Sequence, residues 1–199
     1  MKIITGGQTG VDQIALDSAS LAGLRTGGWA PRGFITAEGK AQFLQKRYGL
    51  QELQRGGSLA SQYVARSCRN VDDAQATLAF LLYYSMGTSK TVGYAVSGKW
   101  TPLGALEVDR REAAPGLVVL DEATCGRRPH RPCIVVKDVQ VPLTGQRRAA
   151  TLSFLQRHSV ETLNICGHRL SARLEAELGG VASFMRELTE LISSNCGGE

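Results

Sequence analysis

A loop close to the start of the chain has the residue types that bind phosphate in many proteins. The apolar run before it ends at Ile4, and a helical pattern begins directly after its five residues, Gly6, Gly7, Gln8, Thr9 and Gly10. A glycine loop between a strand and a helix leaves backbone N–H groups free, and these groups attract an anion together with the helix dipole. The loop matches neither the G-x-G-x-x-G nor the Walker pattern. We therefore expect an anion site here, and a tight turn that requires glycine is the alternative.

A second loop, MGTSKT, repeats this arrangement. It follows an apolar strand-like run, opens a helical pattern, and offers a glycine, two hydroxyls and a positive charge in Gly87, Thr88, Thr91 and Lys90. Two such loops at the carboxyl ends of strands in one sheet would converge on a single crevice. The pair therefore predicts a phosphate-binding crevice, although Thr88 also has the chemistry of a simple helix N-cap.

Two further motifs offer contacts for the remainder of such a ligand. In GGWAPRG, Trp29 has a flat face for stacking on a ring, and Arg32 has a guanidinium that can hold an oxyanion. In NVDDAQAT, the polar residues are Asn70, Asp72 and Asp73, and an acid there can accept hydrogen bonds from a guanidine-like ring edge. The structural alternatives are a core tryptophan beside a surface arginine, and a polar turn that enters a strand.

The remaining reactive residue types do not form a recognisable catalytic or metal site. His168 follows the strand-like TLNICG, but no carboxylate or nucleophile is evident beside it, so we assign it no catalytic role. The five cysteines form no CxxC pair, which favours reduced thiols over a disulfide framework or a zinc site. Cys133 and Cys166 stand in apolar runs, and we expect them to be buried and unreactive.

The composition is typical of a globular domain. The 199 residues are 43% hydrophobic and 21% charged, which predicts one domain over 1–199 with a core of its own. A net charge of +5 suits an anionic ligand, but the chain lacks the dense basic stripe of a nucleic-acid binder. The start shows no signal peptide, and no apolar run approaches the ~20 residues of a membrane span. We expect a cytoplasmic protein, with neither nucleic acid nor a membrane as its partner.

Alternating strand and helix patterns must position these motifs. Short apolar runs predict strands, and apolar residues at helical spacing predict helices. The expected strands cover 2–5, 25–30, 77–84, 132–139 and 162–167, and the expected helices cover 11–22, 62–69, 92–96, 147–158 and a last helix that ends near Ser193. This alternation predicts an α/β fold of the Rossmann-like, doubly wound type, in which helices flank a mostly parallel sheet on both faces.

Two segments do not follow the alternation. Residues 31–59 have weak periodicity and are expected to form a long loop with at most one short helix. Residues 98–131 contain one strand-like piece, Leu117–Leu120, between the stretches DRREAAPG and CGRRPHRP. We expect this second segment to be an insertion or a mobile segment.

Taken together and in their order, the motifs resemble those of the molybdenum cofactor carrier proteins. The matching stretches are GGQTGVDQIALD, GGWAPRG, NVDDAQATL, MGTSKT and TLNICGHRLS. The resemblance spans about three quarters of the chain, and the order of the motifs is more specific than any one of them. These carriers are part of a wider set of Rossmann-like, nucleotide-binding proteins that includes the lysine-decarboxylase-like phosphoribohydrolases.

The resemblance implies a cytosolic protein without enzymatic activity that binds the molybdenum cofactor (Moco), a phosphorylated molybdopterin that holds molybdenum. Such a carrier stores Moco as cargo, protects it from oxidation and passes it to molybdoenzymes, and the Moco biosynthetic machinery is a further expected partner. A homo-oligomer is implied, with a tetramer favoured. By this likeness, the Gly6–Gly10 loop and the Gly87–Thr88 turn bind anions, while Arg32 and the Asn70–Asp73 turn make secondary contacts.

The chain departs from the carrier pattern at three positions. The carriers commonly have arginine where this chain has Gln13, lysine where it has Arg32, and glycine where it has Met86. Gln13 removes a positive charge near the first loop. The missing charge at Gln13 therefore leaves open which ligand the chain binds and how tightly it binds.

Two other functions also remain open. A nucleotide phosphoribohydrolase resembling this fold carries a glutamate in a PGGxGTxxE pattern, but here Thr91 takes its place, which removes the expected acid. A nucleotide sensor or single-strand binder would use the arginines at 127–131 and 147–148, but no aromatic residues interleave with them. A Moco carrier is therefore the leading prediction, and a phosphoribohydrolase or nucleotide-sensing protein is the alternative.

Overall fold

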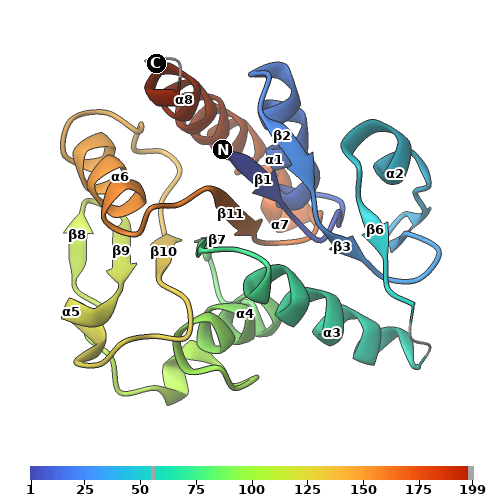
Figure 1. Cartoon of the computed structure of the whole chain (residues 1–199), viewed down its shortest axis with the longest axis horizontal. Helices are drawn as coiled ribbons and strands as arrows, with labels where there is room; N and C mark the ends of the chain where they lie inside the picture. The colour runs from blue at the N-terminus through green and yellow to red at the C-terminus, as the bar shows by residue number, and fades with distance from the viewer. Residues whose placement is uncertain (55–56, 197–199) are drawn as a thin grey trace.

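The computed structural model describes residues 1–54 and 57–196, and it shows a central sheet with helices on both faces (Figure 1). The strands are β1 (Lys2–Ile4), β2 (Arg25–Gly27), β3 (Trp29–Ala30), β4 (Ile35–Thr36), β5 (Gly39–Lys40), β6 (Gln51–Glu52), β7 (Ala76–Phe80), β8 (Glu112–Ala114), β9 (Leu117–Leu120), β10 (Cys133–Val136) and β11 (Thr162–Cys166). The helices are α1 (Val11–Leu21), α2 (Phe43–Tyr48), α3 (Leu59–Asp72), α4 (Met86–Ser97), the 3-10 helix η1 (Leu103–Ala105), α5 (Glu122–Cys125), α6 (Gly145–Arg157), α7 (Ala172–Glu175) and α8 (Leu178–Cys196).

The main sheet has seven strands in the order β2-β1-β11-β7-β10-β9-β8. The first five are parallel to their neighbours, and β9 and β8 add an antiparallel edge. The last strand of the chain, β11, therefore lies between the first strand and β7. If the end of α8 were joined to β1 and the chain opened between α6 and β11, the parallel strands would have the 3-2-1-4-5 order of a doubly wound fold.

Two hydrophobic cores hold the layers together. On one face, α1, α6 and α8 pack against the sheet, and Phe80 of β7 meets Phe184 of α8 edge to face at 5.3 Å. On the other face, α3 and α4 contribute Val71, Val92 and Val96 to a second core. All five residues of β7 are buried, as expected for a strand covered on both faces. The predicted α/β fold with a mostly parallel sheet is confirmed.

The predicted strand 25–30 is wrong as a single element. Gly28 has φ 120, and a Cβ on it would lie 2.1 Å from the carbonyl oxygen of Thr5. The chain therefore leaves the main sheet after β2, and β3 pairs instead with β6 in a separate two-stranded sheet. The predicted strand 77–84 likewise ends early, because β7 stops at Phe80.

The two segments outside the alternation contain regular structure. Residues 31–59 form β4, β5, β6 and α2. A small hydrophobic core that includes Leu44 lies mostly in this segment. Positions 55 and 56 lie outside the described residues. Residues 98–131 form the β8–β9 hairpin and α5, and β9 pairs with β10. This segment is thus the antiparallel edge of the main sheet.

Among the described helices, none combines the length and the apolar character needed to cross a membrane.

Candidate functional site

A cavity of about 550 Å³ opens beyond the carboxyl ends of β1, β11 and β7. This is the position where the connections of a doubly wound sheet diverge and where such folds bind their ligands. Its volume lies within the range of small-molecule sites. The lining residues are Gln8, Asp12, Ala60, Tyr63, Val64, Arg66, Ser67, Ser85, Met86, Gly87, Thr88, Lys90, Thr91, Trp100, Cys166, Gly167 and Arg169.

The amino terminus of α4 forms one wall of this cavity. Ser85 is the N-cap, and its side chain accepts a hydrogen bond from the Thr88 N–H at 3.4 Å. The N–H groups of Met86 and Gly87, in the same turn, have no acceptor among the residues that the structure describes. Free N–H groups at a helix start favour an anion. The interpretation of Thr88 as the cap is therefore wrong, because the helix begins earlier than expected.

The first glycine loop is occupied by the chain itself. The Gly7 N–H donates to Thr5 Oγ1 at 3.0 Å, the Gln8 N–H to Asp12 Oδ2 at 3.2 Å, and the Thr9 N–H to Gln8 Oε1 at 3.0 Å. These three groups are thus not free for a phosphate, contrary to our expectation. From this loop Gln8 lines the cavity, whereas Gly6, Gly7, Thr9 and Gly10 are not lining residues.

Tight packing accounts for two glycines of this loop. Gly7 has φ +70, and a Cβ there would lie 2.7 Å from Leu50 and 2.8 Å from Leu44. A Cβ on Gly6 would lie 1.4 Å from NH1 of Arg66. The tight-turn alternative therefore explains Gly7, and Gly6 makes room for a guanidinium.

A buried ion pair links this loop to α3. Arg66 NH1 lies 3.3 Å from Asp12 Oδ2, and the two side chains are 13% and 4% exposed. Burial raises the pKa of Asp12, and the Arg66 charge and the N–H groups of Gln8 and Gly6 oppose that rise. The Nε of Arg66 is buried and has no hydrogen-bond partner among the described residues.

Sequence reasoning missed both members of this pair. Asp12 stands in the first turn of α1, where an acid is ordinary because it complements the helix dipole. Arg66 comes 54 positions later, and only the packing of α3 against α4 and β3 brings it to the loop. No local pattern identifies such a contact.

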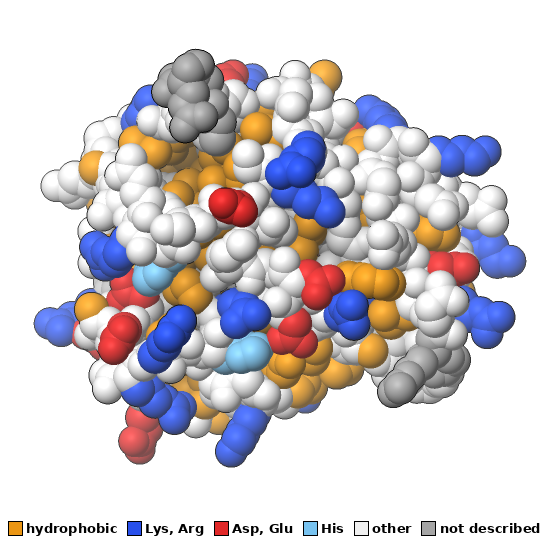
Figure 2. Space-filling model, viewed as in Figure 1, with side chains coloured by type: hydrophobic (Ala, Val, Ile, Leu, Met, Phe, Trp, Pro, Cys, Tyr) orange, Lys and Arg blue, Asp and Glu red, His pale blue; other side chains and the backbone are white. Residues whose placement is uncertain are grey.

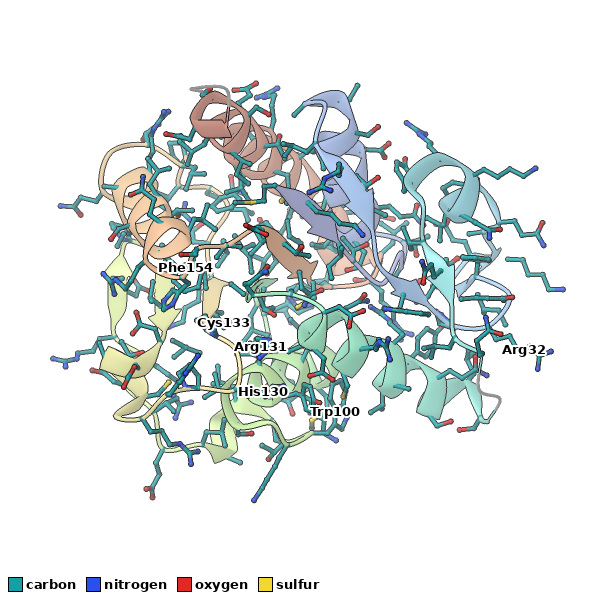
Figure 3. All side chains as sticks on the ribbon, in the orientation of Figure 1. Arg32, Trp100, His130, Arg131, Cys133 and Phe154 are labelled. Carbon is teal, nitrogen blue, oxygen red and sulfur yellow. The ribbon has the colours of Figure 1, made fainter. Side chains whose placement is uncertain are left out.

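The cavity is positively charged and has aromatic walls. Arg66, Lys90 and Arg169 face one acid, Asp12, among the lining residues. Tyr63 and Trp100 add aromatic side chains, and Trp100 lies by α3 and α4 (Figure 3). This combination suits a ligand with an anionic group and a flat ring.

Three of the predicted contact residues, Trp29, Asn70 and Arg32, lie outside the cavity. Trp29 packs under Arg69, whose Cζ is 4.8 Å from the centre of the indole ring. The indole Nε1 of Trp29 donates to Asp73 Oδ2 at 2.6 Å. Asn70 is buried and clamps the backbone of Trp29 through two hydrogen bonds, at 2.8 and 3.1 Å. Arg32 is exposed at the edge of the molecule, well apart from Trp100 (Figure 3). These positions support the packing of α3 on β3 rather than the cavity.

Asp72 belongs to a different polar cluster. Its carboxylate accepts from the Tyr94 hydroxyl at 3.1 Å and lies 2.8 Å from His130 Nε2. The expected polar turn at 70–73 is also wrong in structure, since α3 continues to Asp72. The structure therefore does not bring Asp72 to the cavity.

The second loop contributes the predicted residues Thr91 and Gly87 to the cavity wall. Thr91 is buried, and its Oγ1 donates to the Gly87 carbonyl at 3.0 Å. The space around Gly87 is open, since nothing lies within 4 Å of a Cβ built there. Gln13, the departure near the first loop, donates from Nε2 to the Gly7 carbonyl at 3.1 Å. The predicted site residues that line this cavity are therefore Gln8 of the first loop and Gly87, Thr88, Lys90 and Thr91 of the second loop.

His168 supports the approach to α4. Its Nε2 accepts from the Leu82 N–H at 3.1 Å, and its ring stacks on Tyr83 at 3.7 Å. Burial, with a smaller contribution from Arg173, lowers its pKa to about 4. The imidazole is thus neutral at pH 7, as an acceptor must be, and it fixes the segment that leads to Ser85.

The cysteines that we expected to be buried are buried. Cys133 and Cys166 are both free thiols with little or no exposure, and burial raises the pKa of each. Cys166 lies in the cavity wall at the end of β11. Within residues 1–54 and 57–196, no group of three or more His, Cys, Asp or Glu side chains is placed to hold a metal ion.

The arginines of a nucleic-acid surface are only partly available. Arg147 is 1% exposed, and its guanidinium donates to the carbonyls of Val141 and Asp138. Arg131 donates to the carbonyls of Ala74 and Asp72. The face drawn in Figure 2 mixes acidic and basic side chains without a continuous basic stripe. The basic patch that a nucleic-acid binder would need therefore loses Arg131 and Arg147 to internal contacts.

Comparisons with known proteins agree with this topology. Residues 3–120 match the model of the circularly permutated YpsA SLOG family, and the position of β11 between β1 and β7 is what a circular permutation produces. The fold is similar to the crystal structure of a protein from Syntrophus aciditrophicus SB described as a "putative molybdenum carrier protein", with 25% identity, a TM-score of 0.62, and coverage of 96% of this chain and 94% of that chain. No protein of curated function matched. Because the family match covers more than half of its length, the chain belongs to the circularly permutated YpsA SLOG family.

Proposed function

We propose that this protein is a molybdenum cofactor carrier that binds Moco in the cavity beside α4, stores it and passes it to molybdoenzymes. The observation that carries the proposal is the combination of free α4 N–H groups, three cationic side chains and two aromatic side chains in one cavity. A phosphorylated pterin needs these two chemistries, an oxyanion site and a surface for a flat ring. The likeness to the Syntrophus protein adds support for this ligand.

Within the proposal, the phosphate binds at the amino terminus of α4. Met86 and Gly87 would supply backbone N–H groups, and Lys90 and Arg169 would supply positive charge. The glycine loop at 6–10 is a less suitable place, because its N–H groups at positions 7–9 already donate to Thr5, Asp12 and Gln8, and the Asp12 carboxylate would repel a phosphate. Carrier function also implies that the protein holds its ligand without converting it.

Anaerobic titration with Moco tests this proposal. We expect a stoichiometry of about one Moco per chain. Lys90→Gln and Arg169→Gln should each weaken binding about tenfold, because each removes one charge from a partly desolvated oxyanion site. Lys99→Gln is the matched control, since Lys99 lies beyond the other end of α4 and outside the cavity lining. Unchanged affinity in both site variants would contradict the assignment of the cavity.

A phosphoribohydrolase is the second candidate, because one observation favours it. The cavity contains a carboxylate, Asp12, although Thr91 stands where the glutamate of the hydrolase pattern would be. Asp12 is paired with Arg66, which holds it back from the role of a general acid. Release of ribose 5-phosphate from a nucleoside monophosphate, lost in Asp12→Asn, would favour the hydrolase over the carrier.

A further inference from the structure

Asp12 is the acid of the cavity wall, and the proposed phosphate site does not use it. Among the described residues that line the cavity, the charged side chains besides Asp12 are Arg66, Lys90 and Arg169, which are all cationic. A nearly buried carboxylate is costly unless hydrogen-bond donors surround it. Its presence in a cavity for an anionic ligand therefore calls for an explanation.

The geometry leaves one carboxylate oxygen for a ligand. The Gln8 N–H and Arg66 NH1 both donate to Oδ2, at 3.2 and 3.3 Å. Both distances are long for hydrogen bonds to a charged acceptor, which usually measure about 2.7–2.9 Å. Among the described residues, the Gly6 N–H also stabilises the charged carboxylate, and no other group donates to Oδ1. A ligand with adjacent N–H groups would complete this shell.

The chemistry of a carboxylate restricts which ring edge it accepts. An ionised carboxylate only accepts hydrogen bonds, so its partner must present donors. A 2-amino-4-oxopyrimidine edge presents a ring N–H beside an exocyclic amino group, and pterins and guanine share this edge. Adenine presents an unprotonated ring nitrogen beside its amino group. That nitrogen is an acceptor, so it would face an Asp12 oxygen, which is also an acceptor.

We propose that Asp12 selects the ring of the ligand by accepting hydrogen bonds from a 2-amino-4-oxopyrimidine edge, while Gln8, beside it in the cavity wall, borders the same edge. This inference rests on the proposed function, because it places the ring in the same cavity as the phosphate. It also extends that function, because it predicts that guanine nucleotides compete with Moco and that adenine nucleotides compete poorly.

Calorimetric titration of the full chain with three nucleotides tests the proposal. We expect GMP to bind about tenfold more tightly than AMP, and IMP, which lacks the 2-amino group, to fall between them. In Asp12→Asn, one acceptor becomes a donor, so the preference for GMP over AMP should disappear. Asp17→Asn on the same helix is the control, because Asp17 pairs with Arg47 at 2.8 Å and does not line the cavity.

Each outcome separates this inference from the proposed function. Equal or tighter binding of AMP by the natural chain overturns the role of Asp12, and the proposed carrier function still stands if Moco itself binds. A GMP preference that persists in Asp12→Asn also overturns it. If neither Moco nor any of the three nucleotides binds, both proposals fail. Circular dichroism shows whether Asp12→Asn folds. If it does not fold, the affinities of the natural chain for GMP, IMP and AMP still test the proposed ring selectivity.

Discussion

Single residues of this cavity act through close packing as well as through charge. Arg66 reaches Asp12 only because residue 6 has no side chain, and a Cβ there would lie 1.4 Å from the guanidinium. His168 contributes differently, since it accepts a hydrogen bond from the segment that leads into α4 and stays neutral. Both residues arrange the groups that would touch the ligand.

The neutral state of His168 predicts a pH dependence of stability. Its pKa is about 4 in the folded protein, against an ordinary value near 6.5, so the unfolded chain binds the proton more readily. The stabilising contribution of the neutral form is therefore present above pH 6.5 and is lost as the pH falls from 6.5 to about 4, by up to about 3 kcal/mol.

Thermal unfolding at several pH values checks this prediction. His168→Gln keeps a side-chain acceptor for the Leu82 N–H but does not titrate, so its melting temperature should fall less between pH 7 and pH 5. His130→Gln is the matched control, because His130 is partly exposed and lies in the Asp72 cluster. A pH profile of His168→Gln identical to that of the natural chain would be inconsistent with this role.

At the scale of elements, the sequence predicts what depends on local pattern. The helices at 11–22 and 147–158 and the strand at 162–167 follow from apolar spacing, and they were found within one or two residues. The break at Gly28 could not be predicted, because it depends on the approach of Thr5, the residue that follows β1. The Asp12–Arg66 pair was missed for the same reason, since its members are joined by the packing of α3.

The element order also predicts the tolerance of the fold to a change in connectivity. The end of α8 packs against the end of α1, where Ser193 donates to the Ala22 carbonyl at 3.0 Å. A permuted chain in which a short glycine–serine linker joins residue 199 to residue 1, and which begins at residue 159, should fold with an unchanged far-ultraviolet spectrum, because all strand pairings are kept.

Thermal melting and Moco titration of this permutant give the readout. We expect cooperative unfolding and an affinity within about threefold of the natural chain. Loss of the folded state would mean that the order β2-β1-β11-β7-β10 does not behave as a permuted doubly wound sheet.

At the scale of the whole molecule, the account places one ligand at one edge of one sheet. The cavity draws on residues that follow β1, β7 and β11 and on α3, so it exists only in the complete fold. The predicted loops do meet at this edge, but with different roles from those expected. The second loop offers free N–H groups, whereas the N–H groups of the first already donate to Thr5, Asp12 and Gln8.

The position of the bound phosphate tests this account most directly. A crystal structure of the complex with GMP, or with Moco under anaerobic conditions, would locate it. We predict that the phosphate lies against the N–H groups of Met86 and Gly87 and near Lys90 and Arg169, with Asp12 facing the ring. A phosphate seated on the N–H groups of Gly7, Gln8 and Thr9, with Asp12 displaced, would contradict it.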